Sequence, residues 1–442
     1  MVAPDETRPP PSPPPSPSPA RAAPLGPGYR RLLASSALGN LGDGIALVAL
    51  PWYASTLTDD PLAVAAVGAA TRLPWLLFAL VAGVFGDRVD RRRLMVFSGG
   101  AKALVLASLT ALVALDAAGL PVVLVAALLV GVCEVFFDNT AQALLPSVVP
   151  HSRLERANGT LWSVEEVMSR FVGAPVAGVL VGLSMALAFG AQAALVACAV
   201  LALLTLRGDF RPDRADRSDG EGDGGDRAPL SRMLAEGVRW LWHHRLLRTL
   251  ALVLALSNLA AAMNGAVLVL FAQDVLGLGA RGFGLLLGAV SVGMVIGAQV
   301  MPWLLPRLPP GATLAAVLGV QGAAFTAIAL APSAALFAVL WIMVGFSTVA
   351  WNVLTVSLRQ RVVPHHLLSR VLSAYRTLGW GAVPVGMALA GAVAAGLEPV
   401  WGRQAALSAP FLIAGLISLA LVAVCARHLT SARIRAALAA AE

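Results

Sequence analysis

The stretch Gly83-Val-Phe-Gly-Asp87-Arg88-Val-Asp90-Arg91-Arg92-Arg93 decides the fold, because it is a charged turn between two long apolar runs. Six of the seven residues from Asp87 to Arg93 are charged, whereas only 13% of the whole chain is. The flanking runs, residues 62–85 and 94–115, are each long enough to cross about 30 Å of hydrocarbon as a helix. A short arginine-rich turn keeps its end of such a helix hairpin on the cytoplasmic side. The stretch therefore predicts an integral membrane protein.

The rest of the chain repeats this pattern of apolar runs and short polar turns. The 442 residues are 58% hydrophobic, with a mean hydropathy of +0.79, and the 42 glycines suit close helix packing in lipid. We therefore predict an all-α integral membrane fold with twelve transmembrane helices. The expected helices span residues 31–56, 62–86, 94–115, 120–145, 159–184, 187–206, 249–274, 281–305, 312–331, 333–360, 371–396 and 404–426.

Positive charge alternates from one connection to the next. The net charge of +8 comes almost wholly from arginine, because Lys102 is the only lysine. The arginines gather in every second connection and in both tails, whereas the intervening connections carry acids such as Asp59, Asp60 and Asp116. This asymmetry predicts a multi-pass protein of the cell membrane with both termini in the cytoplasm. It also explains the pI of about 10.5 without nucleic-acid binding.

The two sides of a polar central segment look like copies. Val148-Val-Pro-His151 recurs as Val362-Val-Pro-His365, at an offset of 362 − 148 = 214, and Gly131 and Gly345 match at the same offset. A duplicated six-helix unit predicts two pseudo-symmetric halves. The expected divisions are a disordered proline-rich tail (1–28), a first half (29–206), a linker with an amphipathic helix at 230–244 (207–247), a second half (248–427) and a cytoplasmic tail (428–442).

Several classes of chemistry lack the motifs that they require. Lys102 lies between two alanines inside a span, so the chain has no phosphate-binding loop for ATP hydrolysis. The six histidines show no metal-ligand spacing, and the three cysteines form no CxxC pair. No nucleophile–histidine arrangement is apparent. We therefore expect no metal, no other cofactor and no enzymatic activity.

Ionisable residues at membrane depth are the candidates for function, since each is costly unless it faces a cavity or a partner. Asp43 lies about 18 Å along the first helix, and Asn40 lies one turn away on the same face. Asp43 has no basic residue nearby in its own helix. This isolation favours a role in binding a proton or a substrate.

A second group is expected between the helices on either side of Ser152. Asp138 and Glu166 are equally far from this turn, at 152 − 138 = 14 and 166 − 152 = 14 residues, and Glu134 and Arg170 match at 18. Helical spacing puts Glu134 with Asp138, and Glu166 with Arg170, on shared faces, whereas Glu165 points about 100° away. Arg170 is the cation expected at this depth. Two interpretations remain open, a structural lock between helices or a site that loads and releases a proton.

The pattern Gly83-x-x-x-Asp87-Arg88-x-x-Arg91-Arg92 resembles the signature loop between helices 2 and 3 of the major facilitator superfamily. Asn40-Leu-Gly-Asp43, Phe137-Asp138-Asn139 and Arg156-Ala-Asn158-Gly resemble its macrolide-efflux and siderophore-exporter branch of drug:proton antiporters, over residues 30–427. The resemblance implies a major facilitator fold and proton-coupled export of small amphipathic compounds by alternating access. The alternatives are a solute importer of the same fold and a membrane scaffold or sensor that does not transport.

The resemblance also implies roles for individual residues. Helices 1, 4, 7 and 10 would line a substrate cavity, to which the sequence contributes Asn40, Asp43, Glu134, Asp138, Asn258, Asn264, Trp351 and Asn352. A conformational latch would comprise Gly83, Asp87, Arg88, Arg91, Arg92 and Arg376. In it Asp87 would contact the start of the eleventh expected helix, at 371–396, and Arg91 would pair with Asp138. The implied partners are a small-molecule substrate, protons as the coupling ion and the lipid bilayer, with the protein acting as a monomer.

Overall fold

The structure is a computed structural model, and it describes residues 26–86, 89–150, 153–206, 210, 238–364 and 367–439. Nearly all of these residues are helical. The first half contains α1 (Pro27–Leu57), α2 (Pro61–Gly86), α3 (Arg91–Ala114), α4 (Leu120–Val148), α5 (Leu154–Glu166), the π-helix η2 (Val167–Gly173), α6 (Ala174–Leu183) and α7 (Met185–Leu204). The second half contains α10 (Arg245–Leu270), η3 (Phe271–Val275), α11 (Ala280–Leu304), η4 (Leu305–Arg307), α12 (Pro310–Leu330), α13 (Ala334–Val362), α14 (Leu368–His428) and α15 (Ser431–Ala439).

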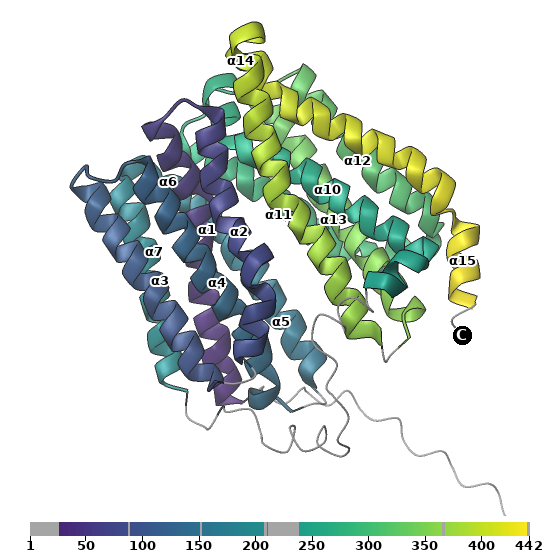
Figure 1. Cartoon of the computed structure of the whole chain (residues 1–442), viewed down its shortest axis with the longest axis horizontal. Helices are drawn as coiled ribbons and strands as arrows, with labels where there is room; N and C mark the ends of the chain where they lie inside the picture. Colours follow the sequence, from purple (N-terminus) through teal and green to yellow (C-terminus); the bar gives the residue numbers. More distant parts are fainter. Residues whose placement is uncertain are drawn as a thin grey trace, which may run out of the picture.

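Eleven helices in the described part of the chain are long and apolar enough to cross a membrane. The longest of them, α14, consists of two helical parts that meet at Gly402, where φ is 76°. Glycine tolerates this left-handed backbone because it has no Cβ. Figure 1 shows the chain reversing direction at the upper end of α14, so its two parts correspond to the separate helices expected at 371–396 and 404–426.

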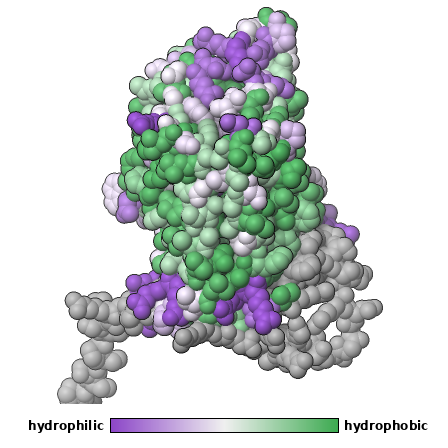
Figure 2. Space-filling model, turned by 90° about the vertical axis from the view of Figure 1, so that its left-hand side faces the viewer, coloured by the Kyte–Doolittle hydropathy of each residue, from purple (hydrophilic) through white to green (hydrophobic). Residues whose placement is uncertain are grey.

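An apolar belt surrounds the middle of the molecule. Figure 2 shows this belt between two hydrophilic ends. Many large apolar side chains on the membrane-spanning helices are exposed, among them Phe97, Leu104 and Leu201. Such a surface is unfavourable in water and favourable against acyl chains. The chain is therefore a multi-pass membrane protein.

The two halves pack against each other through α2 with α14 and through α6 with α11. Glycines bring these helices close together. A Cβ at Gly391 on α14 would lie 2.9 Å from the Cα of Leu62, and one at Gly178 on α6 would lie 2.7 Å from the carbonyl oxygen of Ala280. All four residues lie near the end of the molecule opposite the start of α1 and α15 (Figure 1). The halves are therefore joined closely at that end.

The helix expected at 159–184 is not one regular α-helix. The structure divides it into α5, η2 and α6, with α6 beginning at Ala174 and continuing with Pro175. Proline has no N–H to donate to the carbonyl four residues earlier, and a wider π turn is one way in which a helix accommodates such a break. Helical periodicity alone gives no sign of this interruption.

The polar segments are only partly described. The tail at 1–25 and most of the linker, including residues 211–237, lie outside the described residues. Residues 238–243 of the expected amphipathic helix are helical, with Leu241 buried and with Val238 and Trp242 exposed. In the final segment α15 forms a short helix whose Ile434 is fully buried, so this part of the tail packs on the second half.

Candidate functional site

Asp43 forms an ion pair with Lys102. The Lys102 Nζ lies 2.5 Å from the Asp43 Oδ1 and donates a hydrogen bond to it, which joins α3 to α1. The side chain of Lys102 is 7% exposed and that of Asp43 is 24% exposed. Asp43 has no basic residue nearby in its own helix, and its cation is supplied by α3 instead. Asn40 does not take part, because its amide donates to the carbonyl of Ser36 within α1.

Two acids of α4 interact electrostatically with this ion pair. Glu134 and Asp138 are half-buried and lie one turn apart, and both interact electrostatically with Lys102 and Asp43. On α2, Arg72 interacts in the same way with Glu134. We call Asp43, Arg72, Lys102, Glu134 and Asp138 the charged cluster. It places three carboxyl groups against two cations, so one carboxyl has no cation of its own within the cluster.

Arg170 plays a smaller part than its position in the sequence indicates. Its Nε lies 3.0 Å from Oε1 of Glu166, one turn away in the same helix, and its side chain is 45% exposed. Glu165 was expected to point elsewhere, yet it interacts electrostatically with Asp43 and Glu134. The expectation that Arg170 is the cation at this depth is wrong, because Lys102 and Arg72 lie there on neighbouring helices.

Close backbone packing positions Asp43. The next residue, Gly44, lies directly against η2: a Cβ there would clash with the carbonyl oxygen of Ser169 and would lie 2.7 Å from the Cα of Gly173. Only a residue without a side chain permits this approach. The π-helix that follows Glu166 thus packs against α1 at the level of Asp43.

In the second half, the polar residues that were expected to line a cavity differ from one another in their surroundings. Asn258 on α10 donates to the carbonyl of Gly379 on α14, at 2.9 Å. Asn264 is fully buried, and neither of its side-chain polar atoms has a hydrogen-bond partner. Trp351 is buried in the apolar core of this half rather than presented to an open cavity, because it packs with residues such as Met301. Its neighbour Asn352 is exposed.

The latch residues are described in part. Gly83 lies in the last turns of α2, whereas Asp87 and Arg88 lie outside the described residues. Asp90 caps α3 by accepting a hydrogen bond from the backbone N–H of Arg93. Arg92 donates to the carbonyl groups of Leu203 and Leu204 at the end of α7.

Arg91 does not make the expected contact with Asp138 in this conformation. Arg91 donates to Ser147 at 3.4 Å. Asp138, its expected partner, lies nine residues or about 13 Å deeper in α4, beyond the reach of a side chain that is held at Ser147. Arg376 is exposed on α14, and its expected partner Asp87 lies outside the described residues.

A second charged group lies at the opposite end of the molecule, where the halves meet. Arg403 contacts Asp274 at 2.9 Å and Glu398 at 3.1 Å, and it also donates to the backbone carbonyl of Asp59. Asp59 belongs to the first half and the other three residues to the second. We call these four residues the Arg403 cluster. Beside it, Gln273 donates to Ser55 across the same boundary, at 3.0 Å.

A signal for Lys102 and Arg72 was present in the sequence. Each is a cation near the middle of an apolar run, where a charge without a partner costs several kcal/mol. Lys102 is also the only lysine in a chain that otherwise uses arginine. The choice of partner could not be inferred, because it depends on how α1, α3 and α4 are arranged in space.

The chain matches the transmembrane secretion effector family over residues 20–436. It is 28% identical over 403 residues to the multidrug efflux pump Tap of Mycolicibacterium fortuitum, with 88% of this chain and 94% of that protein covered. It is also 28% identical over 415 residues to the multidrug efflux pump Tap of Mycobacterium tuberculosis (strain ATCC 25618 / H37Rv), with 90% and 94% covered.

Solved structures share the fold at low sequence identity. A mutant of the nucleoside transporter NupG matches with a TM-score of 0.75 and 12% identity, covering 91% of this chain and all of that one. A bacterial homologue of the human lysosomal transporter Spinster matches with a TM-score of 0.67 and 15% identity, covering 94% and 98%. At this identity the likeness concerns the arrangement of helices alone.

Proposed function

Because the chain belongs to the transmembrane secretion effector family of the major facilitator superfamily, we propose that it exports small amphipathic compounds in exchange for protons. The substrates would be drug-like, macrolide-like or siderophore-like molecules. The name of the Tap relatives, multidrug efflux pump, supports export of this kind. The exporter would act as a monomer in the cell membrane, with both termini in the cytoplasm.

The observation that carries the proposal is the Lys102–Asp43 ion pair inside the charged cluster. Two cations cannot neutralise three carboxylates, and an unpaired carboxylate at membrane depth is costly. The excess carboxyl group would therefore hold a proton when the site is empty. Loss of that proton restores a negative charge that attracts a cationic substrate. Proton and substrate would then compete for the same acids, which is the requirement for exchange.

Alternating access would use the two ends of the molecule. Close packing of α2 with α14 and the contacts of Arg403 support a conformation that is closed at the Arg403 end. With the termini in the cytoplasm, this end faces outward. We propose that the latch around Asp87, Arg91 and Arg376 forms at the cytoplasmic end when the outer end opens.

Transport by variants in everted membrane vesicles tests the proposal. Asp43→Asn keeps the shape of the side chain but leaves two carboxyl groups against two cations, so no excess carboxyl would remain to hold a proton and proton-driven accumulation of a cationic dye should fall to the background level. Asp116→Asn is the matched control, because Asp116 lies on an exposed turn with φ 53°, a conformation that asparagine also adopts. Undiminished accumulation by Asp43→Asn would exclude Asp43 from proton coupling.

The same vesicles distinguish the other functions. An exporter fills everted vesicles, because their lumen corresponds to the outside of the cell. Accumulation only in right-side-out vesicles would indicate an importer. No substrate-dependent proton flux in either orientation would indicate a scaffold or a sensor.

A further inference from the structure

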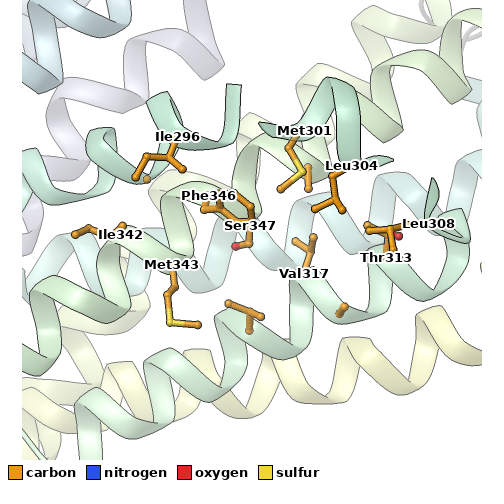
Figure 3. Close-up of a pocket in the computed structure, with 14 residues that line it drawn as sticks. Ile296, Met301, Leu304, Leu308, Thr313, Val317, Ile342, Met343, Phe346 and Ser347 are labelled. Atoms are coloured by element: carbon orange, nitrogen blue, oxygen red, sulfur yellow. The ribbon is translucent and has the colours of Figure 1, made fainter. Parts of the chain in front are cut away.

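A cavity of about 360 Å³ lies in the second half, between α11, α12 and α13. Figure 3 shows it as an elongated space with Ile296, Ile342 and Met343 toward one end and with Leu308 and Thr313 toward the other. Its volume is at the low end of the range of roughly 300–1,000 Å³ found for small-molecule sites. No residue of the charged cluster lines it.

Small residues keep this cavity open. A Cβ at Gly293 on α11 would clash with the carbonyl oxygen of Ile342 on α13, so these two helices touch at one end of the cavity. Further along the cavity the walls include Ala316 on α12 and Ala350 on α13, which fill little space. The cavity is thus formed by the choice of side chains at a helix junction.

The walls offer an occupant almost no polar contacts. The two hydroxyl groups among them belong to Thr313 and Ser347, and each donates to a carbonyl of its own helix, those of Pro309 and Val344. The remaining lining residues are apolar. A polar drug would lose hydrogen bonds to water here without regaining them. A hydrocarbon chain makes no hydrogen bonds to water, so it would lose none on entering.

The cavity opens on the surface that faces the membrane. Ile296 and Met343, at one end of the cavity, are each 45% exposed, and Leu308 at the other end is also exposed. These are exposed apolar side chains on a protein that lies in lipid, so acyl chains are the solvent at the opening. An occupant can therefore enter sideways from the bilayer.

A cation lies at the end of the cavity near Leu308. Arg307 is flanked in sequence by the lining residues Leu304 and Leu308, and its guanidinium lies over the ring of Trp303, 4.3 Å from the centroid. Arg307 also donates to the carbonyl of Trp303. Both side chains are exposed, and no carboxylate among the described residues forms an ion pair with Arg307. An exposed tryptophan beside an arginine is typical of the headgroup level of a membrane.

We propose that this cavity binds one acyl chain of an anionic phospholipid whose phosphate group contacts Arg307. The apolar walls match an acyl chain, and the opening toward the bilayer gives such a chain a way in. The guanidinium of Arg307, which has no carboxylate partner among the described residues, complements the charge of the headgroup. The site is separate from the charged cluster, so its existence does not depend on the transported compound.

Native mass spectrometry of the purified full-length protein tests this site. The probes are phosphatidylglycerol and phosphatidylcholine with the same acyl chains, added after delipidation. Ala316→Phe places a ring in the cavity and should abolish retention of one phosphatidylglycerol. The control is Ala312→Phe, an exposed residue one turn away on the same helix that does not line the cavity. Val320→Phe fills the cavity from the next turn, so one poorly folded variant does not decide the result.

The headgroup contact has its own prediction. Arg307→Gln should lower the preference for phosphatidylglycerol over phosphatidylcholine by about fivefold, the effect of one basic residue near a lipid surface, and Arg307→Lys should keep it. Equal retention of both lipids by the unaltered protein would overturn the proposal. So would full retention of phosphatidylglycerol by both Ala316→Phe and Val320→Phe, or its displacement from the unaltered protein by a transported drug.

Discussion

Lys102 holds the charged cluster together through a contact that its own helix could not provide. Its Nζ reaches Asp43 on α1 and also interacts electrostatically with the acids of α4. An ion pair with both partners largely withdrawn from water is costly to assemble, but it is costlier to break from one side. The stability of the fold and the charge state of the site therefore depend on the same atoms.

We expect Lys102→Met to destabilise the protein by about 3–5 kcal/mol, because it leaves Asp43 without its cation at membrane depth. Adding Asp43→Asn should recover most of this loss, since the double variant has no unpaired charge at that position. Thermal unfolding of the purified variants in one detergent measures both effects. A double variant that is no more stable than Lys102→Met would show that the pair is not energetically coupled.

The sequence indicated the acids of this site better than its cations. Asp43, Glu134 and Asp138 were recognised by their depth in apolar runs, which needs no knowledge of neighbours. Lys102 lies at a similar depth, yet its partner is 59 residues away along the chain. Helical spacing relates residues three or four apart, so it assigned Glu166 to Arg170 correctly and could not assign Lys102 to Asp43.

Helix α1 owes its position to the absence of a side chain at Gly44. The backbone of η2 occupies the space where a Cβ would lie, and Gly173 on η2 has the reciprocal contact, with the Cα of Gly44 2.8 Å from its own Cβ position. These two glycines set the distance between α1 and η2. Residue spacing predicted the helices themselves. It gave no sign of the π-helix, and the contact of Gly44 with Gly173 depends on packing that no local pattern encodes.

Gly44→Ala should therefore be strongly destabilising, by about 2 kcal/mol or more, because two backbones must move apart. Gly39→Ala is the matched control on the same helix, since a Cβ there meets nothing within 4 Å. Alanine at that position should be neutral or should stabilise by about 0.5–1 kcal/mol through its helix propensity. Melting temperatures of the two variants measure the difference. Equal values would contradict the close contact of α1 with η2.

The start of α10 should depend on pH through His244. Its Nδ1 accepts a hydrogen bond from the backbone N–H of Leu247, and its ring stacks on Trp240. Burial lowers the pKa of His244 below 6.5. Because the folded pKa lies below the unfolded value, this stabilisation is fully present above pH 6.5 and is lost as the pH falls through the folded pKa. A protonated ring cannot accept the bond, and it places positive charge at a helix N-terminus.

The test compares the unaltered protein with His244→Asn, which keeps a capping acceptor at every pH. The difference in unfolding free energy between them should change by about 1 kcal/mol between pH 7.5 and pH 5, with the unaltered protein losing stability as the pH falls. Denaturant or thermal unfolding at several pH values provides the measurement. A difference that does not vary with pH would exclude His244 as the titrating group.

Taken whole, the molecule is two bundles of helices joined firmly at one end, and the Arg403 cluster lies at that junction. The twelve expected helices followed from apolar run lengths and polar turns, because the bilayer fixes how long a span must be. The expected division into halves followed from the repeat of Val148-Val-Pro-His151 as Val362-Val-Pro-His365. Which end is closed could not be inferred that way. It depends on Arg403, which reaches from α14 to Asp274 at the end of η3 and to the carbonyl of Asp59 in the other half.

Arg403→Gln should favour opening of this end, because it removes the hydrogen bond from Arg403 to the carbonyl of Asp59, which crosses between the halves, together with the two ion pairs that hold Arg403 in place. A hydrogen bond contributes about 1 kcal/mol net, so the loss of the contact with Asp59 should shift the open-to-closed ratio by about fivefold. Arg281→Gln is the control, since Arg281 is an exposed cation near the same end that forms no ion pair among the described residues. Spin labels at Asp60 and Val400, in a background without the native cysteines, would report the separation of the halves. We expect a second, longer distance for Arg403→Gln alone. An unchanged distance distribution would mean that glycine-mediated packing of α2 on α14 closes this end without help from charge.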